Sequence, residues 1–338
     1  MKRILIGVLA VLALSGALLA ASVFAGGPTT LKLATIAPDG TSFVVALRDA
    51  GKEIEQKTAG RVSFKIYPGG VMGNDAVILR KFRTGQLHGS SFTAGGISQI
   101  YKDYQVMSLP LMIRNYQEAD AVRAQIEPLL TAKLAEQGFI SMGINEIGFA
   151  YLLSNRPVAS VEQLRACKMW VPEGDPVSRV VFEEAGVPPV PLPLTDVLTG
   201  LNTGLIDTVA NSPVGTVALQ WFTKVKYLMQ VPLIYTYSTF AFSDRAWKQL
   251  SAGDQAIVRE ALTKRFRTMD QDTRRANEQA MATLKKQGVQ IVPFNQANWP
   301  KMVDIADRSI QKLIAKGNFD PALVQRIRGI VEPMRRGR

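Results

Sequence analysis

The same order of strands and helices occurs twice in the chain, and this repeat limits the fold more than any other feature. The first copy reads as strand LKLATIA, a helix capped at Thr41 or Ser42, strand RVSFKIYP, helix GNDAVILRKFRTG and strand LHGSSFTAG. The second reads as strand CKMWVP, a helix capped by Asp175 with Pro176 in its first turn, extended VPPVPLP, helix DVLTGLNTG capped by Thr195 and strand LIDTVANSP. Each copy is a βαβαβ unit, which is half of a doubly wound sheet. The repeat therefore predicts an α/β protein with two similar lobes and a cleft between them.

A long proline-free segment after the second copy predicts the element that joins the lobes. It starts at Ser251, has Asp254 in the spacing of a capping box, and runs to Gly288. One helix of this length extends about 50 Å, which exceeds the width of one small lobe. We expect it to span both lobes, with lobe I formed by residues 26–148 and 238–275 and lobe II by residues 149–237 and 276–338.

The first 25 residues have the pattern of a secretory signal. Lys2 and Arg3 precede an apolar run that ends in Val23-Phe24-Ala25, a small-x-small cleavage pattern. We expect cleavage after Ala25 and export to the periplasm, with an uncleaved membrane anchor as the alternative. The single cysteine, Cys167, excludes an internal disulfide.

The residue inventory argues against an enzyme. With one histidine, His88, and one cysteine, the chain has no Ser-His-Asp, Cys-His or histidine-rich metal constellation. It also has no phosphate-binding glycine loop followed by lysine. The adjacent pair Glu183-Glu184 is typical of a solvated helix face. We therefore predict a binding protein without cofactor or metal, and keep a carboxylate-dependent hydrolase as the alternative of another class.

The net charge of +12 is spread along the chain, apart from a terminal cluster at residues 335–338, and no nucleic-acid-binding motif accompanies it. A solvated basic surface explains this charge, and we expect no nucleic-acid partner.

A series of motifs in one order resembles a known family. The chain contains YPGGVMGND, TGQL, SLPLMIRN, LSNRPVASVEQLRACKMWVPEGDPV, PLPLTDVLTGLNTGLIDTVANSP and SDRAWKQLSAGDQ, followed by the long helix. Over residues 31–310 it resembles the solute-binding proteins of tripartite ATP-independent periplasmic (TRAP) transporters, of the C4-dicarboxylate-binding (DctP-like) type. The resemblance implies a two-lobed periplasmic binding protein, type II-like, that closes on a ligand and delivers it to a membrane permease.

The chain departs from that family at three positions. The strand CKMWVP has Trp170 where the family typically carries the arginine that forks onto a ligand carboxylate, and IGFAYLL has Ala150 where a second arginine often stands. The segment IDTVANS has Ala210 in place of a frequent acidic residue, although Asp207 and Asn211 are kept. A closed cleft that buries a carboxylate without a cationic partner is costly. We therefore expect a neutral or hydrophobic ligand, including a lipid-like one, rather than a small dicarboxylate.

Trp170 offers about 150–250 Å² of mostly apolar surface to such a ligand, and several aromatic residues lie in neighbouring segments. Core packing is the ordinary role of each of those neighbours. The full set of expected ligand-binding residues is Trp170, Phe149, Ala150, Tyr151, Asn211, Phe92, Tyr235, Tyr237, Lys168 and Arg179.

Other cations offer a rival interpretation within the same function. Lys168 shares the strand face of Trp170, Arg179 lies in the first turn of the next helix, and Arg156 lies near the cross-over strand. Any of them could hold an aromatic carboxylate stacked on Trp170. A periplasmic lipid carrier without a permease is a further alternative. The partners expected for the receptor are the membrane subunits of a TRAP permease and an accessory periplasmic protein.

Overall fold

The computed structural model describes residues 28–336, so the predicted signal at residues 1–25 lies outside the described residues. The strands are β1 (Thr29–Ala34), β2 (Val62–Tyr67), β3 (Gly89–Thr93), β4 (Phe139–Ser154), β5 (Met169–Pro172), β6 (Pro189–Leu192), β7 (Thr208–Asn211), β8 (Tyr227–Met229), β9 (Ile234–Ser243) and β10 (Gln290–Val292). The helices are α2 (Ser42–Lys57), α3 (Asp75–Arg83), α4 (Ala94–Ile97), α5 (Tyr116–Glu136), α6 (Val161–Leu164), α7 (Pro176–Glu184), α8 (Val197–Thr203), α9 (Pro213–Ala218), α10 (Asp244–Trp247), α11 (Ala252–Lys286), α12 (Trp299–Ala315) and α13 (Pro321–Arg336).

Both predicted βαβαβ units are present. In the first lobe β1 pairs in parallel with β2 and β3, and in the second lobe β5 pairs in parallel with β6 and β7. The Asp175 carboxylate accepts hydrogen bonds from the backbone N–H groups of Val177 and Ser178, as expected of the helix cap. The prediction for Thr195 was wrong: a 3₁₀ turn, Leu194–Asp196, precedes α8, and the residue at the helix start is Asp196.

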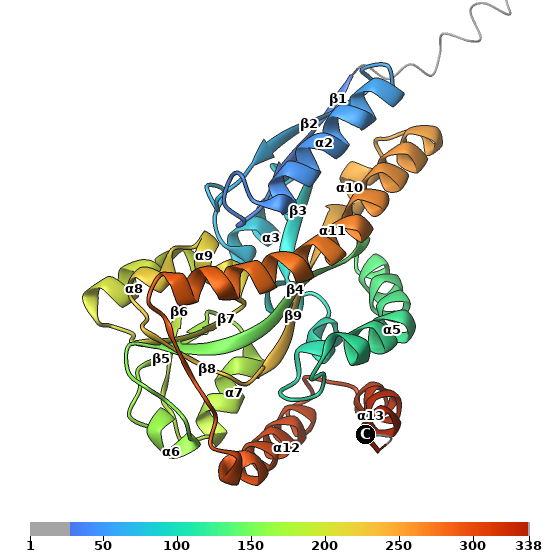
Figure 1. Cartoon of the computed structure of the whole chain (residues 1–338). Coiled ribbons are helices and arrows are strands. Elements are labelled where there is room, and N and C mark those ends of the chain that lie inside the picture. The colour runs from blue at the N-terminus through green and yellow to red at the C-terminus, as the bar shows by residue number, and fades with distance from the viewer. Residues whose placement is uncertain (1–27, 337–338) are drawn as a thin grey trace, which may run out of the picture.

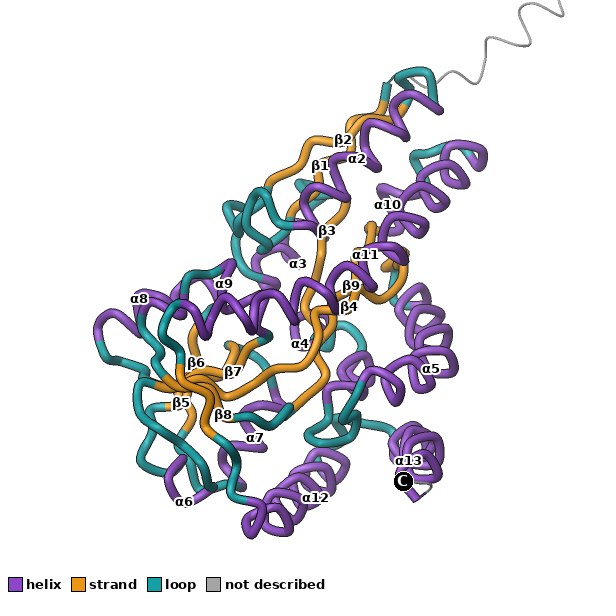
Figure 2. Tube along the Cα trace, in the orientation of Figure 1, coloured by secondary structure: helices purple, strands orange, loops and turns teal. Residues whose placement is uncertain are grey.

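Two long antiparallel strands, β4 and β9, carry the sheet from one lobe into the other (Figure 2). The strand order is β2-β1-β3-β9-β4-β7-β5-β6, with β8 and β10 attached beside β4. The register between β4 and β9 shifts between Ser141 and Ile144 and again between Glu146 and Gly148. Such bulges bend a strand pair and increase its twist. Gly148 has φ +107°, and a Cβ there would lie 2.7 Å from the Asn277 amide nitrogen on α11, so this bend requires glycine.

The long helix α11 lies across both lobes, as predicted (Figure 1). The Ser251 hydroxyl caps it by accepting a hydrogen bond from the Asp254 N–H. The helix packs on α2 of the first lobe, on β4, and on α9 of the second lobe. Phe266 is buried in the first-lobe core, and Leu284 is buried in a cluster of the second lobe.

The last two helices lie against different parts of the molecule. Helix α12 packs on α7 of the second lobe, whereas α13 packs on α5 (Figure 1). The Arg335 guanidinium fastens α13 by two hydrogen bonds to the buried Glu118 carboxylate, at 2.9 and 2.7 Å. The lobe limits expected from the sequence stay a prediction, because β4, β9, α11 and this C-terminal segment connect the two halves continuously.

Candidate ligand site between the lobes

The two lobes touch through the loops that follow their parallel strands. Asn74 of the first lobe donates a hydrogen bond to the Glu173 carboxylate at 3.3 Å, and Gln105 donates to Asp175 at 2.7 Å. A Cβ on Gly70 would lie 3.1 Å from the Thr195 methyl group. In α/β proteins, ligands bind beyond the carboxyl ends of parallel strands. These contacts therefore mark the border of the candidate site, which we call the interlobe region.

The buried carboxyl group of Asp75 lies next to one of these contacts. Asp75 is the first residue of α3, next to Asn74, and its Oδ2 accepts a hydrogen bond from the Thr93 hydroxyl at 2.6 Å. Its Oδ1 is buried without a hydrogen-bond partner among the described residues. A Cβ on Gly96 would lie only 1.9 Å from Oδ2, so the glycine makes room for the carboxyl group. Burial raises the pKa of Asp75 to about 6, although the hydrogen bond from Thr93 opposes this shift.

The Asp75→Asn variant is expected to gain stability relative to the wild type as the pH rises. A carboxyl whose native pKa is raised from 3.8 to about 6 stabilises the fold fully below pH 4, and this contribution is lost as the pH rises through 6. The amide does not ionise, so the difference in unfolding free energy should grow by about 2–3 kcal/mol between pH 4 and pH 7. Urea unfolding of both proteins at four pH values measures this difference. If their unfolding free energies change with pH in parallel, the raised pKa of Asp75 is contradicted.

Three neutral amide side chains also have unpaired buried atoms. They are the Gln105 carbonyl oxygen, the Asn211 amide nitrogen, and both amide atoms of Asn145, none of which has a hydrogen-bond partner among the described residues. Asn211 lies at the end of β7, opposite Tyr151 of β4, and its oxygen accepts a hydrogen bond from the Ser212 N–H at 2.8 Å. Because unpaired buried polar atoms are costly, each is a candidate for hydrogen bonding to a ligand.

Trp170 is built into the wall of the second lobe. Only 4% of its surface is exposed, and its indole N–H donates to the Leu192 carbonyl at 3.0 Å. Its ring meets that of Trp221 edge to face, with the centroids 5.2 Å apart. Leu153 and Val209 belong to the same cluster. The indole therefore fills space and has its polar atom satisfied, and its contact with a ligand stays a prediction.

The three predicted residues of β4 face different surroundings. Phe149 packs between the rings of Tyr116 and Tyr235, at centroid distances of 5.1 and 5.5 Å. Ala150 is 2% exposed and pairs with Ile234. Tyr151 is partly exposed and packs against clusters on both sides of the lobe boundary, and burial raises the pKa of its hydroxyl. Of these three, Tyr151 has the position best suited to meet a ligand.

The other predicted aromatic residues lie in the core. Phe92 and Tyr235 are completely buried, and Tyr237 is 1% exposed. The Tyr235 hydroxyl donates to Glu146 at 2.9 Å, and the Tyr237 hydroxyl donates to the Tyr104 carbonyl. These groups have their partners within the protein, so we leave them out of the site proposed below.

The three candidate cations point to different partners. The Lys168 ammonium donates to the Gly204 carbonyl at 2.9 Å, and Arg156 forms an ion pair with Asp207 at 2.9 Å. Arg179 is exposed on α7, and no ion pair is recorded for it among residues 28–336. Its charge is therefore the most readily available of the three to an anionic ligand.

Sequence reasoning missed a buried ionic network at the bend of β4. The Glu146 carboxylate is fully buried and accepts hydrogen bonds from Arg274 of α11 at 2.7 and 2.8 Å. Arg274 also pairs with Asp120 of α5, and Arg123 of the same helix pairs with Asp270 at 2.7 Å. A charged residue within the mostly apolar run of β4 was the signal available in the sequence. The network joins α5, β4 and α11 where the strands pass between the lobes.

The residues that the structure describes contain neither a metal-binding cluster nor a membrane-spanning helix. No group of three or more histidine, cysteine or acidic side chains among them could hold a metal ion. Within the same residues, no helix has the length and apolar character needed to cross a membrane.

Comparison with known proteins identifies the family. The model of the bacterial extracellular solute-binding proteins, family 7 (DctP), matches residues 33–317. The chain belongs to this family. The sialic acid-binding periplasmic protein SiaP of Vibrio cholerae is 23% identical over 309 residues, which cover 88% of this chain and 95% of that protein. The motif resemblance seen in the sequence is thereby confirmed.

Solved structures of this family have the same two-lobed fold. The sugar acid binding protein DctPAm of Advenella mimigardefordensis, in complex with galactonate, superposes with a TM-score of 0.84 at 20% identity, covering 91% of this chain and 99% of that one. A TRAP periplasmic solute binding protein of Desulfovibrio salexigens with bound orotic acid gives 0.81 at 18% identity, covering 90% and 97%. The predicted fold class is confirmed.

Proposed function

We propose that the chain is the periplasmic receptor of a TRAP transporter, which captures one uncharged solute between its lobes by hinge closure and delivers it to the membrane permease. Export through a signal cleaved after Ala25, the permease subunits and an accessory periplasmic protein are parts of this proposal. Family membership supports the receptor function, since relatives such as SiaP are solute-binding proteins of the periplasm.

The observation that carries the choice of an uncharged solute is the chemistry of the interlobe region. Its unpaired buried groups include the neutral amides Gln105 and Asn211 and the carboxyl group of Asp75, whose raised pKa already reflects the cost of a negative charge there. A second negative charge nearby would increase that cost. At position 170, where the family typically has an arginine, the indole N–H is bound to the Leu192 carbonyl. We therefore expect a solute with hydrogen-bonding groups and an apolar surface.

The solutes of known relatives favour the rival interpretation. Galactonate and orotic acid are both acids, and a lipid-like solute finds no support among them. Arg179 is the first candidate to supply the cation for an acid, because Lys168 and Arg156 already have partners within the protein.

Calorimetric titration with galactonate, orotate and succinate tests the proposal. Two charged hydrogen bonds contribute about 1.5–3 kcal/mol each, so the absence of an arginine fork should weaken binding of such acids by at least about 100-fold. We expect no detectable binding at micromolar concentrations. Micromolar binding that is lost in Arg179→Ala would contradict the proposal and establish an acid receptor anchored at Arg179. The matched control is Arg165→Ala, because the Arg165 guanidinium already bonds the Ala185 carbonyl.

A further inference from the structure

An apolar cavity lies beside the interlobe region, mainly in the second lobe, and Pro110 and Leu111 of the first-lobe segment also line it. It has a volume of about 90 Å³ and lies between α7, α12 and the face of the sheet formed by β4 and β7. Leu152 of β4 lines it, whereas Leu153 belongs to the cluster around Trp170. Because side chains alternate along a strand, the cavity and Trp170 lie on opposite faces of the sheet.

The lining is almost entirely apolar. Among the twenty described residues that line the cavity, the polar side chains are those of Ser160 and Ser178. The Ser160 hydroxyl accepts a hydrogen bond from the Gln163 N–H, and the Ser178 hydroxyl donates to the Asp175 carboxylate at 2.9 Å. Cavities that are apolar throughout stay dry and bind small apolar molecules, as an engineered cavity of about 150 Å³ binds benzene.

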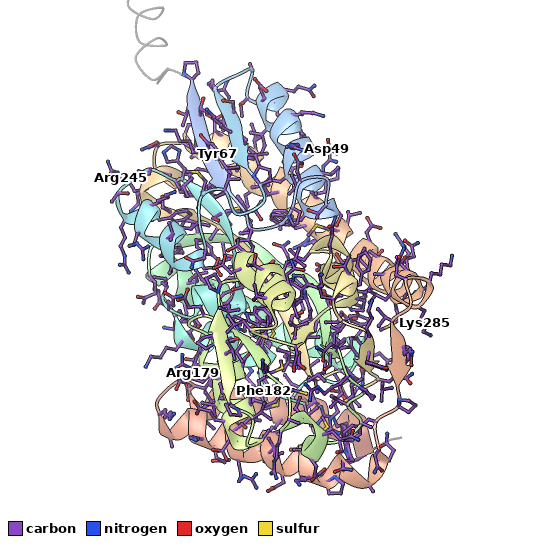
Figure 3. The ribbon with its side chains drawn as sticks, turned by 90° about the vertical axis from the view of Figure 1, so that its left-hand side faces the viewer. Asp49, Tyr67, Arg179, Phe182, Arg245 and Lys285 are labelled. Atoms are coloured by element: carbon purple, nitrogen blue, oxygen red, sulfur yellow. The ribbon has the colours of Figure 1, made fainter. Side chains whose placement is uncertain are left out.

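The arrangement of helices leaves a mouth through which a small molecule could enter. Val181 of α7, Leu233 and Met302 of α12 line the cavity and are partly exposed, whereas Phe182 is only 7% exposed. In the view of Figure 3, Phe182 is labelled nearer the middle and Arg179 of the same helix nearer the left edge. No charged side chain lines the cavity in the part of the chain that the structure describes.

We propose that this cavity is a second binding site, which takes an uncharged hydrocarbon group no larger than a single six-membered ring. Three alanines line the space: Ala185 after α7, Ala210 on β7 and Ala306 on α12. The proposal does not rest on the solute or on the transport function proposed above, because its test uses neither the solute nor the permease.

Methyl NMR of protein labelled in its methionine methyl groups tests the site, with benzene as the probe. Met229 and Met302 line the cavity, whereas Met142 is buried in the first-lobe core and serves as the internal reference. We expect saturable shifts of the first two methyl signals and none of the third. Unchanged spectra, or equal shifts of all three signals, would overturn the proposal.

Two alanine substitutions on one helix provide the matched pair. Ala306→Leu fills the cavity and should weaken benzene binding at least tenfold, whereas Ala315→Leu, at the exposed end of α12, should leave it unchanged. Equal benzene binding by both variants would contradict the assignment. Should Ala306→Leu fail to fold, the wild-type methionine shifts decide the question alone.

Discussion

Replacing Glu146 by alanine is expected to lower the free energy of unfolding by about 3–5 kcal/mol, because it removes the buried acceptor that holds the bend of β4 to α11. The side chain has no exposed surface and accepts hydrogen bonds from Arg274 and from the Tyr235 hydroxyl. An arginine stays protonated in proteins, so the charge of the Arg274 guanidinium remains when Glu146 is removed. The variant also leaves the hydroxyl of Tyr235 buried without its acceptor.

Urea unfolding of Glu146→Ala measures this loss, and two further variants serve as comparisons. Glu146→Gln keeps the shape of the side chain and should cost less. Asp272→Ala removes an ion pair with Arg275 in which both side chains are more than half exposed, so it should change stability by no more than about 0.5 kcal/mol. A Glu146→Ala protein as stable as Asp272→Ala would show that the network does not hold the bend of β4 to α11.

The Trp170→Ala variant is expected to lose about 3–5 kcal/mol of unfolding free energy, as is usual for truncation of a buried tryptophan. The substitution removes the packing against Trp221 and the hydrogen bond to the Leu192 carbonyl. Trp170→Phe keeps an aromatic ring but cannot donate, so it should lose a smaller amount, of which about 0.5–1.5 kcal/mol belongs to the hydrogen bond.

Thermal or urea unfolding of both variants, combined with binding of the natural solute, separates two roles of Trp170. If Trp170 packs within the second lobe without touching the solute, it is needed for stability. Trp170→Phe should then bind the solute with nearly wild-type affinity. A residue that lies under the ligand gives the opposite result: little loss of stability and a large loss of affinity. The second result would contradict the packing described for Trp170.

The repeated units and the long helix could be predicted because local signals mark them. Asp175 and Ser251 cap helices through their own side chains, and Pro176 fits the first turn. Thr195 has the same capping chemistry but its hydroxyl bonds the Asp196 side chain, because a 3₁₀ turn is inserted before α8. A single extra turn of this kind leaves no clear mark in the sequence.

The aromatic residues of the predicted site could not be placed from the sequence because both faces of this sheet are covered. Alternation along β9 shows that Tyr235 and Tyr237 share a face. It does not show whether that face meets α5 or a ligand, and the structure packs both rings into the core. Where helices cover both sides, strand patterns lose the contrast between a buried and an open face.

The ionic network and the apolar cavity escaped prediction for a different reason. Glu146 and Arg274 are 128 residues apart, so their pairing depends on how α11 crosses the bent strand. The cavity results from the space left between Ala210, Ala306 and their larger neighbours. Both features belong to packing between distant segments, which the periodicity of one segment does not report.

The proposed function requires that the interlobe region binds an uncharged solute where relatives bind acids. Mass spectrometry of the small molecules released on denaturing freshly purified, exported protein identifies this solute. We expect one compound without a carboxylate, present in about equal amount to the protein and bound again when added back. A carboxylic acid released in that amount and bound again by the refolded protein would contradict it.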